Sequence, residues 1–88
     1  MIFQPGSGGS GGGISAIRGS IQNGSVTLKK EAEAVIFYTG EGDYCTCIPR
    51  GVGGIPIGSG ARNLVSFNSD GITITKTGDL FLYYVALG

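Results

Sequence analysis

The sequence contains no histidine and only two cysteines, Cys45 and Cys47. Without an imidazole, neither a serine nor a cysteine nucleophile has its usual general base, and no other base stands in a suitable pattern. A structural zinc site needs four nitrogen or sulfur ligands, which one chain of this composition does not supply. We therefore expect a protein that is not an enzyme and that carries no cofactor and no metal.

Charge is also scarce, because only 14% of the residues are charged and six basic residues balance six acidic ones. Binding to phosphate backbones or anionic membranes requires a basic surplus. No apolar run approaches the roughly 18 residues of a membrane-spanning helix. The first residues lack the pattern of a secretion signal. We expect no nucleic-acid binding, no membrane insertion and no signal peptide.

The chain does contain many short runs of β-branched and aromatic residues, separated by turn residues every eight to twelve positions. This spacing is typical of antiparallel all-β domains. No segment has the apolar period of a helix. The sequence predicts a small antiparallel β-sandwich or compact barrel of six to seven short strands. The expected strands cover residues 14–22, 25–29, 34–39, 44–48, 64–67, 72–75 and 80–87, and Val52, Ile55 and Ile57 dock a loop or form one very short strand.

The glycine-rich tract GSGGSGGG, residues 6–13, divides the chain. Its composition is that of a flexible linker, natural or engineered, with a reach of about 15 Å. It separates the apolar start of the chain from everything that follows. The predicted organisation is an N-terminal segment with a Gly/Ser linker, residues 1–13, and a single β domain, residues 14–88.

The longest apolar run, residues 80–87, follows an alternating stretch, residues 72–75. Residues 76–79 read as the turn between them, so residues 71–88 are expected to form the hairpin around which the rest packs. Asn23 and Gly24 predict a second hairpin, because this pair favours a type I′ turn. Residues 40–43 and 68–71 predict two more turns.

Adjacent tyrosines at the end of the chain point to an interface, because side chains of neighbouring strand residues lie on opposite faces. One of the two tyrosines therefore faces outward, either as ordinary strand composition or toward a partner, and the register is left open. The expected oligomer interface comprises Phe81, Tyr83, Tyr84 and Val85, with the alternate set containing Leu80, Leu82 and Tyr84.

The loops offer a second candidate surface, because binding sites on β scaffolds commonly lie in loops. Residues 40–43 and 51–60 are the two candidates, and exposed tyrosines suit sugar stacking or protein contact. The carboxylate pairs Glu31 with Glu33 and Glu41 with Asp43 are interpreted as solvated surface. The expected ligand-binding residues are Tyr38, Glu41, Asp43 and Tyr44.

The two cysteines, at positions i and i+2 of an expected strand, share one face. Their Cα atoms would lie about 6.5–7 Å apart, at the limit for a disulfide. We interpret them as small reduced side chains, with an intersubunit metal or disulfide as the alternative.

Four stretches resemble a known group of proteins: GSGGSGGG from Gly6, AIRGSIQNGSVTL from Ala16, EAEAVIFYTG from Glu31 and ITITKTGDLFLYYVALG from Ile72. In these the chain is similar to short glycine-rich β proteins encoded near tail genes of phages and prophages of Gram-positive bacteria. The resemblance implies a virion-associated or tail-associated protein, made in the bacterial host cytoplasm, with other virion or tail proteins as partners. It implies no functional residues.

Together these observations predict a non-enzymatic structural or assembly protein, a phage-type virion or tail accessory module. A chain of this length hides only roughly 60–65% of its unfolded surface, so association would add stability. We expect a homo-oligomer, with a trimer as the first choice. The alternative is a module that binds a host-surface glycan or protein through residues 40–43 and 51–60.

Overall fold

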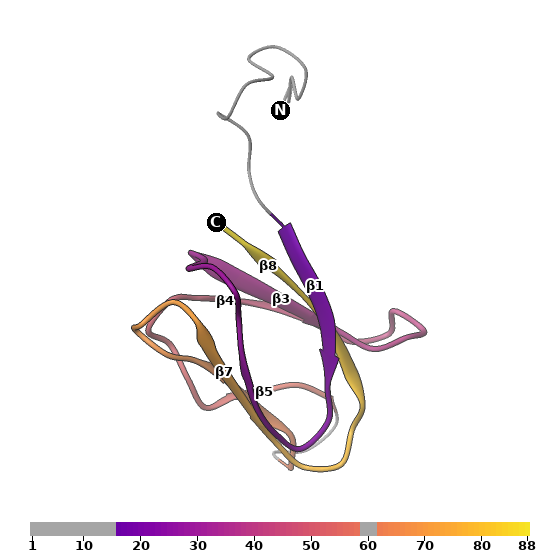
Figure 1. Cartoon of the computed structure of the whole chain (residues 1–88). Helices are drawn as coiled ribbons and strands as arrows, with labels where there is room; N and C mark the ends of the chain where they lie inside the picture. The colour runs from indigo at the N-terminus through magenta and orange to yellow at the C-terminus, as the bar shows by residue number, and fades with distance from the viewer. Residues whose placement is uncertain (1–15, 59–61) are drawn as a thin grey trace, which may run out of the picture.

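The computed structural model describes residues 16–58 and 62–88, which form two four-stranded antiparallel sheets and contain no helix (Figure 1). Sheet A has the strand order β1-β8-β3-β4, and sheet B has the order β2-β7-β6-β5. The strands are β1 (Ala16–Ile21), β2 (Gly24–Thr27), β3 (Ala34–Tyr38), β4 (Cys45–Pro49), β5 (Ile55–Pro56), β6 (Leu64–Phe67), β7 (Thr73–Thr77) and β8 (Leu82–Leu87).

The all-β prediction is confirmed, with eight strands instead of six to seven. The additional strand is the two-residue β5, which fits the expected very short strand in the second glycine-rich segment. The predicted boundary between residues 1–13 and the domain from residue 14 lies outside the described residues.

Two of the expected hairpins are present. Strands β3 and β4 pair across the turn at residues 40–43, with Val35 opposite Ile48. Strands β6 and β7 pair across the turn at residues 68–71, with Phe67 opposite Ile74. In both cases, the turn residues join neighbouring strands whose side chains alternate between the core and the outer face.

The predicted hairpins at Asn23–Gly24 and within residues 71–88 are wrong. Strand β1 pairs with β8, not with β2, and β7 pairs with β2 and β6, not with β8. Both sets of turn residues instead carry the chain from one sheet to the other. At each of these places the chain bends out of one sheet and into the other, and we call such a bend a corner. A corner uses the same glycine and polar residues as a hairpin turn.

The two corners belong to one antiparallel ribbon, in which β1 and β2 run alongside β8 and β7. Ala16 lies opposite Leu87 at one end and Thr27 opposite Thr73 at the other. At the bend, residues 22–23 face the longer stretch 77–81, and the two connections pass side by side (Figure 1). The Gln22 Nε2 donates a hydrogen bond of 2.9 Å to the Asp79 carbonyl oxygen, which joins the two bends.

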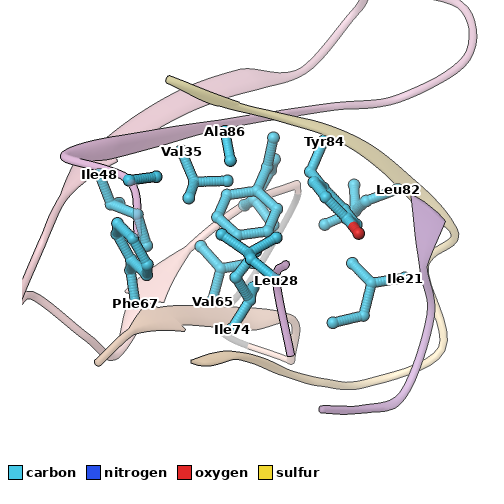
Figure 2. Close-up of a cluster of buried hydrophobic side chains, with 13 residues drawn as sticks. Ile21, Leu28, Val35, Ile48, Val65, Phe67, Ile74, Leu82, Tyr84 and Ala86 are labelled. Atoms are coloured by element: carbon cyan, nitrogen blue, oxygen red, sulfur yellow. The ribbon is translucent and has the colours of Figure 1, made fainter. Parts of the chain in front are cut away.

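The core lies between the sheets and takes side chains from both of them (Figure 2). Period-two alternation sends every second side chain inward. The buried apolar residues are Ile21, Leu28, Ala32, Val35, Phe37, Ile48, Ile57, Val65, Phe67, Ile74, Leu82, Tyr84 and Ala86.

Gly19 has a specific packing role in this core. It lies directly across from Tyr84, and the Tyr84 ring and hydroxyl occupy the place where a Cβ of residue 19 would lie. A larger residue at position 19 would therefore displace the tyrosine ring from its buried position.

Substitution of Tyr84 and Phe81 by aspartate tests the register of β8. Tyr84 is 6% exposed and Phe81 is 45% exposed. We expect Tyr84→Asp to lose at least about 3–5 kcal/mol, because it removes a buried ring and buries a charge. Phe81→Asp should cost less than about 1.5 kcal/mol, mainly through its ring contact.

Urea denaturation followed by circular dichroism measures both losses. Equal losses in the two variants, or a larger loss for Phe81→Asp, would contradict the register.

Candidate functional site

The outer face of sheet A, turned away from the core, is almost free of charge. The register aligns its side chains in three cross-strand rows. The rows are Ser20, Tyr83, Tyr38, Cys45; Arg18, Val85, Ile36, Cys47; and Ala16, Leu87, Ala34, Pro49. Arg18 is the single charged residue of this face, and most of the remaining residues are aliphatic or aromatic.

The outer face of sheet B is instead lined with hydroxyl groups. The Ser25 and Thr75 side-chain oxygens lie 3.2 Å apart, in hydrogen-bonding contact across β2 and β7. Such a face is readily hydrated. Its outward residues are Ser25, Thr27, Thr73, Thr75, Thr77 and Ser66, with Leu64 and Pro56 at the β6–β5 side.

The charged side chains concentrate in the connections between strands. Of the six basic and six acidic residues, only Arg18 and Lys76 lie within a strand, and Lys76 is buried. The exposed strand surfaces therefore differ in hydroxyl and apolar content instead of in charge. A partner of sheet A's outer face has to match shape and apolar surface.

An aromatic cluster of Tyr38, Phe81 and Tyr83 occupies one end of that outer face. The Tyr38 and Tyr83 rings stack with centroids 5.6 Å apart, and Phe81 meets Tyr83 edge-on at 5.2 Å. Tyr83 is 40% exposed. A Cβ on Gly40 would lie 3.3 Å from the Tyr83 ring, so the ring reaches the β3–β4 turn.

Thr39 fixes the β3–β4 turn through its side chain and backbone. Its Oγ1 donates to Asp43 Oδ1 at 2.7 Å and accepts from the Tyr44 backbone N–H at 3.3 Å. The Gly42 N–H donates to the Thr39 carbonyl at 2.9 Å, with Gly42 at a φ of 78°. The turn is therefore held by its own hydrogen bonds.

The predicted ligand-binding residues all lie at this turn. Glu41, Asp43 and Tyr44 are exposed, whereas Tyr38 is half-buried in its stack with Tyr83. Asp43 has its carboxylate engaged by Thr39, so it is in part a turn-stabilising residue. Phe81 and Tyr83, which the sequence predicted as interface residues, complete the same surface.

The two predicted binding loops do not form a common site. Residues 40–43 precede β4 and residues 51–58 follow it, so they lie at opposite ends of that strand. A groove of about 360 Å³ lies at the second end, between residues 51–53 and 67–70. The exposed tyrosines lie at the first end, and residues 59–60 of the second loop are outside the described range.

The expected oligomer interface requires one correction. Phe81, Tyr83 and Val85 face outward, away from the core. They form one of the two outward-facing sets that the sequence predicted for the last strand. Tyr84 is buried within the subunit and packs over Gly19, so it is not available to a partner.

Cys45 and Cys47 are free and exposed on β4, the edge strand of sheet A. The backbone N–H of Arg50 donates to the Glu33 carbonyl oxygen, so the backbone groups of Arg50 and of every second residue before it point toward β3. The backbone groups of Cys45 and Cys47 therefore point to the open edge of the sheet. Within residues 16–58 and 62–88, no three His, Cys, Asp or Glu side chains group as metal ligands.

Lys76 is a functional candidate that the sequence interpretation missed, although alternation with Ile74 on β7 could have revealed that it points inward. It is 0% exposed. Its Nζ donates to Asn63 Oδ1 at 2.9 Å and to the carbonyls of Thr77 and Gly78 at 3.1 and 2.9 Å. Burial lowers its pKa below 10.5, and the charge of Asp79 partly opposes this.

These contacts give Lys76 a structural role. Asn63 Oδ1 also accepts the Leu80 backbone N–H at 3.0 Å, so one amide oxygen joins Lys76 to the β7–β8 corner. All three ammonium hydrogens have neutral oxygen acceptors, which suits the protonated form of a lysine that holds two loops together.

Arg50 organises the opposite end of the sheets. Its guanidinium contacts Glu31 at 3.1 Å and Glu33 at 3.3 Å, and its Nε donates to the Ser69 carbonyl at 2.8 Å. Asp70 accepts the backbone N–H groups of Ile72 and Thr73 and the Thr73 hydroxyl, and these bonds lower its pKa. Both groups stabilise turns.

Comparison with known proteins returned no relatives: no protein family, no curated protein and no solved structure matches the chain. Over the part of the chain that the structure describes, no helix is long and apolar enough to cross a membrane. Function must therefore be argued from the surfaces themselves.

Asn63→Ala tests the link between Lys76 and the corner. The variant leaves two donors, Lys76 Nζ and Leu80 N–H, without their shared acceptor. We expect a loss of about 1–3 kcal/mol per unsatisfied buried donor. Asn68→Ala is the matched control, because Asn68 is exposed.

Chemical denaturation of both variants measures the difference. If Asn63→Ala were no less stable than Asn68→Ala, Asn63 would not act as the shared acceptor.

Proposed function

We propose that this chain is a non-enzymatic structural protein that assembles with copies of itself, and that it serves as a virion or tail accessory module of a phage or prophage. The setting in a virion rests on the resemblance of its sequence segments to glycine-rich tail-region proteins. Other virion or tail proteins are then its further partners. We also propose the β-sandwich, instead of a closed barrel, as the finer description of its two sheets.

The apolar outer face of sheet A is the main support for the proposed self-assembly. In a small soluble domain, one face of a sheet normally meets the core and the other meets water. Here both faces of sheet A are apolar, with Val85, Ile36 and Leu87 in the outward rows. These aliphatic side chains are half-buried and Tyr83 beside them is 40% exposed, so the face forms a contiguous, partly exposed apolar patch. The largest such patch on a protein is often functional.

The size of the domain supports the same proposal. One small core leaves a narrow margin of stability, and association covers apolar area that one subunit leaves exposed. The hydroxyl-lined outer face of sheet B stays well hydrated in such an assembly. In the proposed assembly, the outer face of sheet A would therefore be buried between subunits and the outer face of sheet B would be in contact with water.

Absolute mass in solution tests the proposed self-assembly. We expect size-exclusion chromatography with light scattering to give a mass above the 9.0 kDa of one chain, rising with concentration. Added reductant should leave the mass unchanged, because apolar contact and not a disulfide holds the copies together. A 9.0 kDa species at every concentration would contradict self-assembly.

Saccharide binding is a second candidate function, favoured by the aromatic cluster. Tyr38, Phe81 and Tyr83 lie together beside the β3–β4 turn, where Glu41 and Asp43 offer carboxylate acceptors. Sugar rings stack their C–H faces on exposed aromatic rings and hydrogen-bond to nearby carboxylates. A host-surface glycan is the ligand class that this surface suits.

Titration with soluble N-acetylglucosamine oligosaccharides tests this second function. The chain has no tryptophan, so its fluorescence comes from four tyrosines, of which Tyr38 and Tyr83 belong to the cluster. If a glycan binds there, Tyr83→Ala should weaken binding at least about tenfold, as expected for loss of roughly 1.4 kcal/mol of stacking. Thr75→Ala, on the hydroxyl-lined face, should leave binding unchanged, and equal effects would exclude the cluster as the site.

A further inference from the structure

We propose that a second copy of this chain covers the outer face of sheet A in a face-to-face pair, related by a twofold axis along the seam between β8 and β3. The inference rests on the proposed self-assembly and names the surface and the symmetry through which it occurs.

The chemistry of the face selects a second copy as its occupant. A charged or strongly polar partner finds one charge there, that of Arg18, and no carboxylate. A surface that is itself apolar and carries little charge is the complement, and the same face of another copy has these properties. The hydroxyl-lined face of sheet B lacks them, so the two unlike faces do not complement each other.

The presence of one such face favours a closed pair. An isologous contact uses the same patch on both subunits and is complete with two copies. A threefold ring requires two different patches that fit each other, and the outer surfaces of the two sheets are not matched in this way. The proposed assembly is therefore a dimer, in place of the trimer expected from the sequence.

The position of Arg18 determines the direction of the axis. It lies on β1, at one edge of sheet A, in the middle row of the face. An axis perpendicular to the strands would place the two Arg18 side chains against each other, and like charges in contact are unfavourable. An axis parallel to the strands moves each Arg18 over the opposite edge strand, β4.

The parallel axis also brings matching side chains together. It places β8 over the partner's β3, so Val85 meets the partner's Ile36 and Tyr83 meets the partner's Tyr38. At the margins, Arg18 lies over the partner's Cys47. The two sheets would pack about 10 Å apart with their strands within about 30° of parallel.

The area of the face predicts a reversible pair. Four strands about 4.8 Å apart and six residues at about 3.3 Å each give a projected face of about 380 Å². That lies within the size range of the largest apolar patch on a typical monomer, which is often functional, and it is smaller than the roughly 800 Å² per partner of a standard interface. We expect the dimer to form with rising concentration.

Site-directed cross-linking tests the geometry. In a Cys45→Ser background, Arg18→Cys puts a new thiol opposite the partner's Cys47. Sheets about 10 Å apart hold facing Cα atoms beyond the roughly 7 Å limit of a disulfide, so the cross-linking reagent is a short bismaleimide. Each maleimide adds one thiol across its double bond, with no leaving group. Within one subunit, β8 and β3 separate positions 18 and 47 by about 14 Å, and a link inside one subunit would leave the mass of a single chain on the gel.

Thr75→Cys in the same background is the matched control, because position 75 lies on the outer face of sheet B. Cys45→Ser alone gives the background reaction of Cys47. We expect a cross-linked dimer on a non-reducing gel for Arg18→Cys, several-fold more abundant than in either control. Equal yields in all three proteins would overturn the assigned face.

Sedimentation equilibrium of the unmodified chain, from about 1 µM to about 1 mM, tests self-assembly independently of the assigned interface. A monomer–dimer equilibrium together with selective cross-linking supports the proposal. A dimer with equal cross-linking overturns this face and leaves self-assembly standing. A trimer overturns the twofold axis, and a monomer throughout overturns both.

Discussion

The antiparallel ribbon formed by β1–β2 and β7–β8 is the constraint on which the rest of the structure depends. Its two arms contribute two paired strands to each sheet, and its bend sets the distance between the sheets. Strands β3 and β6 then add to its β8 and β7 edges. The Gln22–Asp79 bond and the Lys76–Asn63 contact lie at or beside the bend, where the ribbon has lost its regular ladder.

Local sequence patterns predicted strands well and their partners only in part. Alternation and β-branched runs determine where β3, β6 and β8 lie, because these signals act within a few residues. The pairing of β1 with β8 joins residues at opposite ends of the described chain, and no local signal encodes it. Asn23 and Gly24 specify a bend, but whether a bend returns along the same sheet or crosses to the other depends on the core.

The surface chemistry was predictable to a similar degree. Alternation in β8 gave two candidate outward sets, and only the close packing of Tyr84 over Gly19 selects Phe81, Tyr83 and Val85. The aromatic cluster combines Tyr38 with residues more than forty positions away, so it depends on the β3–β8 register. Alternation with Ile74 places Lys76 inward, but one of its acceptors, Asn63, lies on a separate loop, so no local signal shows how a buried ammonium is satisfied.

The division of side chains between the two outer faces gives the proposed assembly its main physical support. Charge could have made sheet A's outer face soluble at almost no cost to the fold, since side chains there do not enter the core. Ten of the twelve charged residues lie instead in the connections, and residues with hydroxyl groups cover the outer face of sheet B. A monomer gains nothing from an exposed apolar sheet, whereas a pair that buries it gains hydrophobic stabilisation and covers the aromatic surface at the same time.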